Sequence, residues 1–277
     1  MSRLHLHWFL PTNGDSRDIV GSGDGSQSTL GAVADGFRRP SIEYLGQIAR
    51  SAEQLGFEAV LTPTGTWCED AWLTTAALSQ VTTTLKFLVA FRPGLITPTL
   101  AAHQAATFQR ISGGRLLLNV VTGGDPVEQR RFGDHLDHDQ RYSRTDEFLA
   151  VLRGVSAATE PFDFTGEHYR IEQARIPFAP FEPPPVFFGG ASPAAERVAA
   201  KRVDTYLAWG GDAAADRRAA GSDAHARGRG GAGAAVRHPL PRAQPRHGGR
   251  GVGRGRPARR PDRRGPGRAG AGAVRGE

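Results

Sequence analysis

The sequence contains few of the features that mark secreted, disulfide-stabilised or membrane proteins. Its 277 residues include one cysteine, Cys68, so no disulfide can form within the chain, and a reducing compartment is expected. No segment approaches the roughly 20 apolar residues that are needed to span a bilayer. The N-terminus lacks a basic region followed by an apolar core, because His5 and His7 interrupt its first apolar run. These absences predict a cytoplasmic protein without a membrane anchor.

Residues 212–277 lack almost every residue type that builds a hydrophobic core. They contain no Ile, Phe, Tyr, Trp, Met, Lys, Thr, Asn or Cys, and a single leucine, Leu240. Arg, Gly, Ala and Pro number 16, 15, 15 and 6 there. With five acidic residues the segment carries a net charge of +11, which leaves −4 for residues 1–211 of a chain whose total is +7. We therefore predict a globular domain over 1–211 and a low-complexity basic tail over 212–277.

Two explanations of the tail stay open. Arg, Gly, Ala and Pro have codons that begin with two G or C bases, so a frameshift near codons 211–215 of a GC-rich gene would enrich these four residues. Alternatively, the tail is a real disordered segment, because its apolar content is too low to offset the entropy of ordering. A basic tail can bind nucleic acid through the phosphates, but this tail lacks the Phe and Tyr that provide base stacking. That lack argues against nucleic acid as a partner.

Residues 4–211 alternate between short apolar runs and segments with helical spacing. The runs 85–91 and 116–121 are fully apolar, which is typical of strands buried on both faces of a parallel sheet. Strands are expected at 4–10, 59–61, 85–91, 116–121, 186–189 and 205–209, and helices at 42–55, 70–80, 98–111, 147–157 and 194–202. A long loop is expected at 15–36 and a hairpin at 163–171, with Gly166 in its turn. Six strand-plus-helix steps, the last without its helix, favour an incomplete α/β TIM barrel or a doubly wound sheet.

The loops that follow the strands carry the unusual side chains. The segment Leu61–Trp72 packs hydroxyls, one thiol, two acids and two indoles directly after a strand. Its Cys68 is either a reactive group or a small buried apolar residue, and Asp70 is expected to be the N-cap of the next helix. Trp8–Asp15 ends the first strand with two aromatic residues that belong either to the core or to a site. In a TIM barrel all such loops lie on one face, where the active site is found.

Three further segments have the features of a phosphate site. Asn119–Pro126 ends a strand in a glycine-rich loop that lets backbone amides approach a ligand, although a tight turn alone also needs glycine. Arg141 and Tyr142 supply a cation and a phenolic donor. Phe187–Ser192 leads into a helix whose free amides and dipole attract an anion. Together these segments indicate a cradle for a mononucleotide such as FMN.

His135 and His138 have a spacing that suits metal ligands on one helical face. The sequence places no third ligand beside them, and no cysteine is near. We therefore predict no metal site.

In this order, the segments resemble the bacterial-luciferase-like flavin monooxygenases, most closely the alkanesulfonate monooxygenase branch. The resemblance covers about residues 4–211. It rests on seven segments: Trp8–Asp15, Leu61–Trp72, Lys86–Pro93 with Pro98 and Thr99, Asn119–Pro126, His138–Tyr142, Phe187–Ser192 and Tyr206–Gly211. It implies a luciferase-like TIM (β/α)8 barrel, reduced FMN from a separate NAD(P)H:FMN reductase, and a homo-oligomer. It further implies that an alkanesulfonate and O2 are converted to an aldehyde and sulfite in a site that a lid closes to water.

The resemblance also implies roles for single residues. Thr122, His138, Tyr142, Ala191 and Ser192 match positions that contact FMN in such barrels. Cofactor contacts are also expected from Thr64, Arg141 and Gly190. Cys68 corresponds to a cysteine near the flavin in the sulfonate branch, which makes it a candidate for the catalytic side. Asn13 is the second catalytic candidate and stands where close relatives often have histidine.

Beyond Gly211 the resemblance stops. In the family that part forms a helix and the last two strands, which supply the sulfonate-binding and lid residues. Val236–His238 lies roughly where a strand bearing Arg and His would fall, but Pro239 and Pro241 disfavour a central strand there. The sequence therefore predicts either an impaired enzyme or a catalytically inactive barrel fragment, with a basic-tail nucleic-acid-binding protein as a third, weaker reading.

Overall fold

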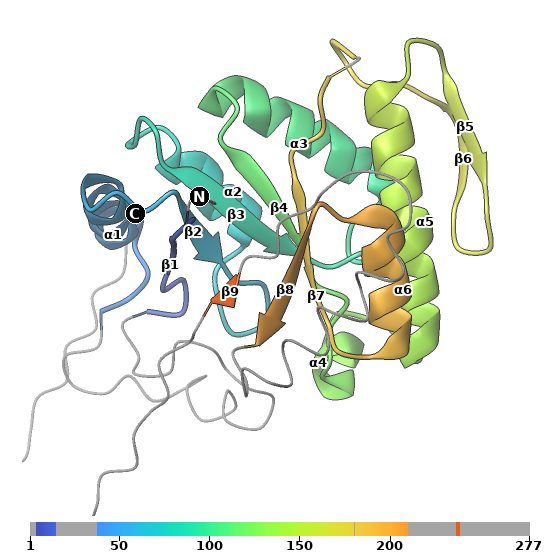
Figure 1. The fold of residues 1–277 in the computed structure, drawn as a ribbon, viewed down its shortest axis with the longest axis horizontal. Coiled ribbons are helices and arrows are strands. Elements are labelled where there is room, and N and C mark those ends of the chain that lie inside the picture. Colours follow the sequence, from blue (N-terminus) through green and yellow to red (C-terminus); the bar gives the residue numbers. More distant parts are fainter. Residues whose placement is uncertain (1–3, 15–37, 180, 210–236, 239–277) are drawn as a thin grey trace, which may run out of the picture. The chain divides into compact units, whose positions relative to one another are not determined.

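The computed structural model of the chain describes residues 4–14, 38–179, 181–209 and 237–238. The expected loop at 15–36 lies outside these residues, and so does all of the tail 212–277 except Arg237 and His238. Within the described residues, parallel strands form one curved sheet with helices packed against it (Figure 1). No helix among them is both long and apolar enough to cross a membrane.

Strand order in the sheet follows the order of the chain. The strands are β1 (His7–Phe9), β2 (Ala59–Thr62), β3 (Lys86–Phe91), β4 (Leu116–Val120), β7 (Val186–Gly189), β8 (Thr205–Trp209) and β9 (Arg237–His238). They are neighbours in that order, and each pair is parallel, with Leu61 opposite Leu88 and Leu118 opposite Val186. A doubly wound sheet reverses its strand order at a switch point, and this sheet does not. The six predicted strands therefore form an incomplete TIM barrel, as expected.

The short strand β9 lies at the edge of the described sheet. This position agrees with the expectation that Pro239 and Pro241 disfavour a central strand at 236–238. In the structure Arg237 and His238 pair with Ala208 and Trp209 of β8. The strand has two residues and ends before the first proline, so the missing proline N–H is not needed within it.

Six helices lie in the described part of the chain. They are α1 (Ile42–Gln54), α2 (Ala71–Leu78), α3 (Pro98–Ser112), α4 (Pro126–Arg131), α5 (His138–Ala157) and α6 (Pro193–Arg202). Their starts are fixed by side chains that accept backbone N–H groups: Ser41 accepts from Tyr44 and, as predicted, Asp70 accepts from Leu73. Such N-caps satisfy amides that the helix itself leaves free.

Two helical features were missed in the sequence. The short helix α4 was not predicted, although Asp125 caps it and Pro126 opens it. Helix α5 starts nine residues earlier than expected, at a capping box formed by Asp137 and Gln140. Its polar first half lacks the apolar spacing on which the prediction depended.

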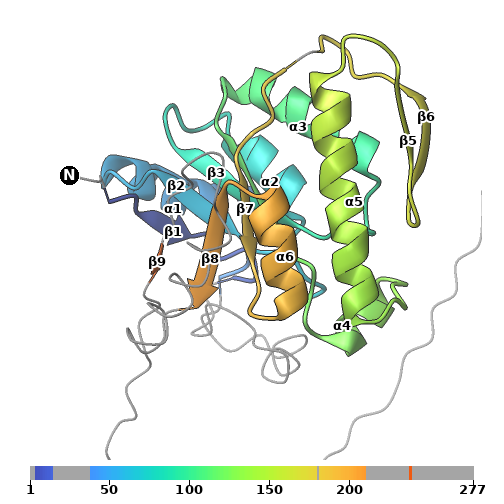
Figure 2. The same ribbon diagram turned by 45° about the vertical axis from the view of Figure 1, so that its right-hand side comes forward.

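The predicted hairpin is present beside the barrel sheet. Its strands β5 (Phe162–Thr165) and β6 (Arg170–Ala174) pair antiparallel and form a separate two-stranded sheet. The carboxylate of Glu147 in α5 accepts the backbone N–H groups of Glu167, His168 and Tyr169. These bonds hold the hairpin turn against α5 (Figure 2).

Apolar side chains alternate between the two faces of the sheet. On the outer face Val60, Phe87 and Leu118 belong to the main core, which also contains the buried residues of the helices. On the inner face Ala59, Leu88, Leu117 and Phe187 form a second cluster with Leu61 and Leu207. Alternation of this kind follows from the two-residue period of a strand, and bulky inner residues fill the interior of TIM barrels. The alternating sequence of the strands therefore provides one apolar layer between the sheet and the helices and a second one on the inner face of the sheet.

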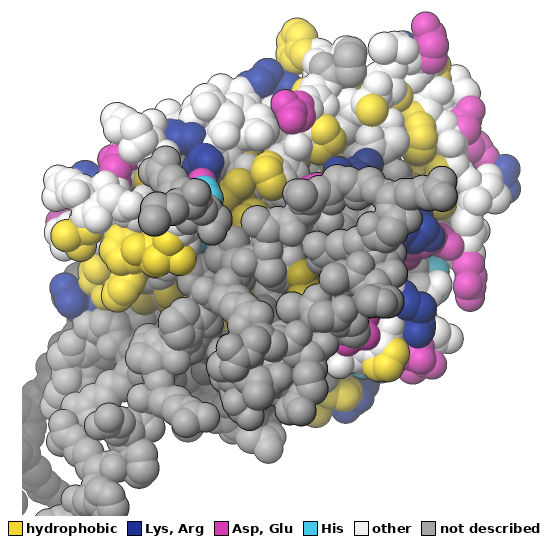
Figure 3. Space-filling view, viewed as in Figure 1, with side chains coloured by type: hydrophobic (Ala, Val, Ile, Leu, Met, Phe, Trp, Pro, Cys, Tyr) yellow, Lys and Arg dark blue, Asp and Glu magenta, His cyan; other side chains and the backbone are white. Residues whose placement is uncertain are grey.

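One apolar patch remains exposed at the β1 edge of the sheet. Leu4, Leu6 and Trp8 occupy alternate positions and are 74%, 49% and 51% exposed, although the Trp8 ring contacts Phe57. Figure 3 shows hydrophobic side chains gathered over α1 and β1.

Candidate functional site

The predicted site residues follow the carboxyl ends of strands in one parallel sheet. Thr64 and Cys68 come after β2, Thr122 comes after β4, and Gly190–Ser192 come after β7. Because β2, β3, β4 and β7 are successive neighbours, the loops after them lie along the same edge of the sheet. This is the edge at which TIM-barrel active sites are built.

Tyr142 connects the start of α5 to the loop after β7. A Cβ atom on Gly190 would lie 2.8 Å from the Tyr142 Oη and 2.6 Å from the Ala195 Cβ, so only glycine permits this approach. The His138 ring lies with its centroid 4.8 Å from that of Tyr142. Tyr206 in β8 donates its hydroxyl hydrogen to the Gly190 carbonyl. Three predicted cofactor residues, His138, Tyr142 and Gly190, are thus brought together.

Arg141, which directly precedes Tyr142, is buried rather than on the surface. Its side chain is 5% exposed, and its guanidinium donates to the carbonyl oxygens of Leu136 at 2.6 Å and Gly123 at 3.4 Å. Its Nε has no partner among the described residues. Two N–H groups of the guanidinium therefore hold the loop after β4 and the segment before α5, and the buried Nε–H remains as a donor.

Thr122 has a buried hydroxyl with no partner in the described part of the chain. The side chain is 5% exposed, and its Oγ1 accepts and donates no hydrogen bond there. Its carbonyl accepts from Gln129 Nε2 at 3.2 Å. The amide of Gln129 occupies the space where a side chain on Gly123 would lie, and Gly123 has a φ of 89°. An unsatisfied buried hydroxyl costs free energy, which a ligand can recover.

Ser192 and Ala191 stand at the start of α6. The Ser192 Oγ accepts the Ala195 N–H at 3.2 Å and so caps the helix, while its own hydroxyl hydrogen stays available. Ala191 is exposed and Ser192 is half-buried. The positive end of the helix dipole therefore faces the loop after β7.

Cys68 and Asn13 belong to two loops that are connected by a backbone hydrogen bond. The Glu69 N–H donates to the Thr12 carbonyl at 2.9 Å, and Asn13 is half-buried in the loop after β1. The Cys68 thiol donates to the Gly65 carbonyl at 3.7 Å. Burial raises the pKa of this thiol to about 11, and the Glu128 carboxylate adds to the increase. Cys68 is therefore protonated at neutral pH and is a weak nucleophile.

The sequence reasoning missed a buried ion pair beside these loops. Arg92 directly follows β3, and its Nη2 lies 2.5 Å from Oε2 of Glu128 in α4. The two side chains are 6% and 10% exposed. An arginine at the end of the apolar run Phe87–Phe91 was the available signal, because charged residues are rarely buried without a partner.

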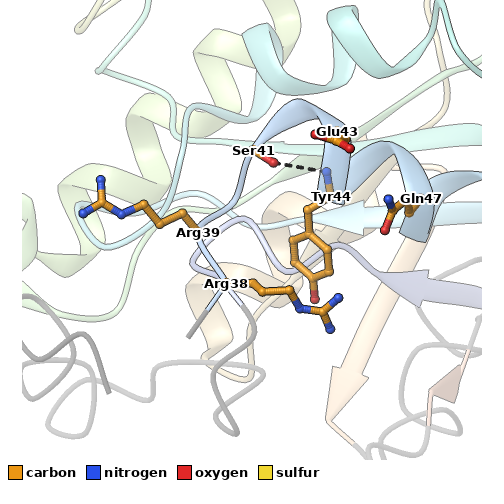
Figure 4. Close-up of a pocket in the computed structure, with 6 residues that line it drawn as sticks. All are labelled: Arg38, Arg39, Ser41, Glu43, Tyr44 and Gln47. Carbon is orange, nitrogen blue, oxygen red and sulfur yellow. Dashed lines mark hydrogen bonds between the residues drawn. The ribbon is translucent and has the colours of Figure 1, made fainter. Parts of the chain in front are cut away.

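A hollow of about 320 Å³ lies beside the start of α1. It is lined by Arg38, Arg39, Ser41, Glu43, Tyr44 and Gln47 (Figure 4). The Arg38 guanidinium stacks 4.5 Å from the centre of the Tyr44 ring, and Arg39 points away from it. Apart from Tyr44 the lining residues are exposed, so charges here are screened by water.

Metal ligands do not gather in the described residues. Among them, no group of three or more His, Cys, Asp or Glu side chains is arranged to hold a metal ion. The His138 ring instead lies against Tyr142, and its Nδ1 lies 2.7 Å from Asp139.

The strand order, the helices outside the sheet and the polar loops at its carboxyl edge define a TIM-barrel protein. The model of the family described as luciferase-like monooxygenase matches residues 4–242. The chain belongs to the luciferase-like monooxygenase family.

Solved structures with the same fold include proteins whose descriptions name FMN or F420. EDTA monooxygenase (EmoA) from Chelativorans sp. BNC1 is 20% identical, with a TM-score of 0.66 over 81% of this chain and 58% of that one. Riboflavin lyase (RcaE), described with modified FMN and riboflavin, is 20% identical, with a TM-score of 0.68 over 82% and 60%. An F420-dependent secondary alcohol dehydrogenase is 19% identical, with a TM-score of 0.59 over 74% and 58%. The chain thus spans about three fifths of the length of each of these proteins.

Proposed function

We propose that this chain is a reduced-FMN-dependent monooxygenase that acts on alkanesulfonates. In the proposed reaction, an alkanesulfonate, O2 and FMNH2 give an aldehyde, sulfite, water and FMN. One oxygen atom enters the carbon that bears the sulfonate, the C–S bond breaks, and the second oxygen atom leaves as water. Membership of the monooxygenase family supports the reaction class, and the seven sequence segments support the sulfonate branch.

The observation that carries the proposal is the set of unsatisfied buried donors at the carboxyl edge of the sheet. The Thr122 hydroxyl and the Arg141 Nε–H have no partner among the described residues, and both side chains are at least nine-tenths buried. Phosphate and ring oxygens of a mononucleotide accept hydrogen bonds from such groups. The residues present therefore fit FMN.

Each proposed residue has a distinct task. Ser192 and the positive end of the α6 dipole would bind the phosphate, and Thr122 and Arg141 would donate to the nucleotide from the loop after β4 and from α5. Tyr142, held against Gly190, would orient it. Bound reduced FMN supplies the two electrons that activate O2. The apolar residues of the inner face, Leu88, Leu117 and Phe187, would exclude water from that chemistry.

The resemblance assigns sulfonate binding and the lid to the region after Gly211, where the resemblance stops and the sequence becomes rich in Arg, Gly, Ala and Pro. We therefore expect this chain to bind reduced FMN but to release little sulfite. We also propose that FMNH2 reaches the chain from a separate NAD(P)H:FMN reductase, and that the chain forms a homo-oligomer.

Anaerobic titration of the full chain, followed by turnover, tests the proposal. FMNH2 produced by photoreduction, oxidised FMN and F420 are each titrated, with flavin fluorescence and absorbance as the signal. Air and a panel of linear alkanesulfonates are then added, and released sulfite is measured. Binding of FMNH2 with sulfite release supports the proposal in full. Binding without sulfite contradicts the alkanesulfonate assignment, and failure to bind FMN, or a preference for F420, contradicts the cofactor assignment.

A further inference from the structure

One carboxylate joins three parts of the chain near the carboxyl end of β3. The Glu128 Oε2 lies 2.5 Å from the Arg92 Nη2, and its Oε1 accepts the Thr66 N–H at 2.9 Å. The Arg92 Nη2 also donates to the Thr64 carbonyl at 3.4 Å. The ion pair therefore ties β3 and α4 to the loop 63–69, which carries Thr64 and Cys68.

The backbone of this loop packs directly on the ion pair. A Cβ atom on Gly65 would lie 2.7 Å from the Glu128 Oε1 and would also collide with the Trp67 indole nitrogen. On the other side, the centre of the Phe132 ring lies 5.6 Å from the Arg92 Cζ. The loop can thus approach the carboxylate only because residue 65 is glycine.

The pair is a poor source of stability, which points to a different reason for its presence. Arg92 Nε and Nη1 are buried and have no partner among the described residues. Removing charges from water is costly, and an apolar pair of similar volume often replaces a buried ion pair without loss of stability. What an apolar pair could not do is accept the Thr66 N–H and donate to the Thr64 carbonyl.

We propose that Arg92 and Glu128 are positioning residues that hold the loop 63–69, and with it the Cys68 thiol, at the carboxyl edge of the sheet. The inference rests on the proposed function in one respect, namely that this loop faces the flavin. The geometry of the pair and its effect on the thiol are independent of the substrate and of the cofactor.

The charged and polar groups around Cys68 can be named. Arg92 and Glu128 face it from β3 and α4, and Thr12 faces it from the loop after β1. Glu69 and Asp70 follow it in its own segment and are exposed. Burial is the main cause of the raised thiol pKa, the Glu128 charge raises the pKa further, and the Arg92 charge lowers it. Neutralising Glu128 should therefore favour the thiolate, and neutralising Arg92 should disfavour it.

The test measures how fast iodoacetamide alkylates the protein between about pH 7 and pH 10. Cys68 is the single cysteine of the chain, so the rate reports on this thiol alone. Each unit by which the pKa falls raises the thiolate fraction, and hence the rate below the pKa, by about tenfold. We expect faster alkylation in Glu128→Gln and slower alkylation in Arg92→Met. The charge-conserving variant Arg92→Lys should stay close to the parent rate, and the double variant Arg92→Met/Glu128→Gln should return toward it.

The matched control is Glu53→Gln. Glu53 also accepts several backbone N–H groups, but it holds residues 83–85 rather than the loop 63–69. The Glu53→Gln substitution should leave the alkylation rate unchanged at every pH. Circular dichroism confirms that each variant is folded. If both single variants speed alkylation, loss of either partner releases the loop, which supports the holding role without a separate effect of the charges. If neither single variant changes the alkylation rate, the pair does not hold the loop, and the proposal is overturned. If the single variants do not fold, the unmodified chain decides: a Cys68 pKa at or below the ordinary value for cysteine overturns the proposal.

A second measurement separates this inference from the proposed function. FMN is added before iodoacetamide, and the decrease in rate is recorded. Opposite shifts in the two single variants together with protection by FMN support both proposals. Opposite shifts without protection support the positioning role and count against a loop that faces the flavin.

Discussion

The phenol oxygen of Tyr142 fills the space that any side chain at Gly190 would occupy. A Cβ atom there would lie 2.8 Å from that oxygen. Helix α5 and the loop after β7 are distant in the sequence, and this contact brings them together at the carboxyl edge of the sheet. A change in the loop at Gly190 should therefore also move Tyr142, which is a proposed flavin contact.

Gly190→Ala should weaken FMN binding more than it weakens the fold. The added methyl group must displace Tyr142 or Ala195, at a cost of about 1–3 kcal/mol for overpacking, and Tyr142 carries the proposed cofactor contact. Flavin fluorescence titration and thermal unfolding measure the two effects. The control is Gly189→Ala, whose Cβ would meet Leu207 at an ordinary 3.5 Å, so it should unfold near the parent temperature. Equal effects of the two substitutions would contradict the steric argument.

Thr122→Val should separate ligand binding from stability. The two side chains have nearly the same shape, and the Thr122 hydroxyl has no partner among the described residues. Its loss should therefore leave the free energy of unfolding unchanged or raise it by up to about 1 kcal/mol. The FMN affinity should fall about tenfold, as for the loss of one hydrogen bond. Urea denaturation and flavin titration test this, and Thr122→Ser, which keeps the hydroxyl, should bind nearly normally.

The sequence predicted the strands of the barrel wall, whereas two helical features and several contacts beside the proposed site became visible only in the structure. Apolar runs such as Leu85–Phe91 determine strands locally, and their order along the chain is also their order in the sheet. Helix α4 and the first half of α5 were missed because capping and tertiary contacts stabilise them, and these leave little periodicity in the sequence.

The site residues differ in how much the sequence could reveal. The turn before α6 at Gly190, Ala191 and Ser192 was predictable because a glycine-rich turn before a helix is a local pattern, and the cofactor role of these residues stays a prediction. The Arg92–Glu128 pair was not, because its partners lie 36 residues apart and meet only once β3 and α4 are placed. Arg141 was predicted as a phosphate partner, and the two backbone carbonyls that its guanidinium also binds become visible only in the structure.

Separating Arg144 from Asp134 should destabilise the chain strongly. The Arg144 guanidinium bonds both Asp134 oxygens, at 3.1 and 2.6 Å, and the side chains are 12% and 4% exposed. Burial alone would raise the pKa of Asp134, yet the Arg144 charge holds it below its usual value. Asp134→Asn or Arg144→Met should cost about 3–5 kcal/mol, because each leaves a buried charge without its partner. Urea denaturation should show that the double variant loses less than the two single losses combined; strict additivity would mean that the charges do not interact.

The carboxylate of Glu53 should contribute stability that disappears in acid. It accepts the N–H groups of Thr83, Thr84 and Leu85, between α2 and β3. Burial works to raise its pKa, but these backbone hydrogen bonds outweigh that effect and lower the pKa to about 2, from 4.5. Because the folded-state pKa is depressed, the contribution is complete above pH 4.5 and is lost as the pH falls toward 2.

Comparison with Glu53→Gln across that pH range tests the linkage. At neutral pH the variant should be less stable by about 1 kcal/mol, since the carboxylate is partly exposed and its charge is screened. As the pH falls through the window, the parent chain loses its advantage and the two unfolding free energies should converge. The control is Glu43→Gln, which removes the same charge from the exposed first turn of α1. A gap between parent and Glu53→Gln that stays constant from neutral pH into acid would show that the lost contribution is packing rather than charge.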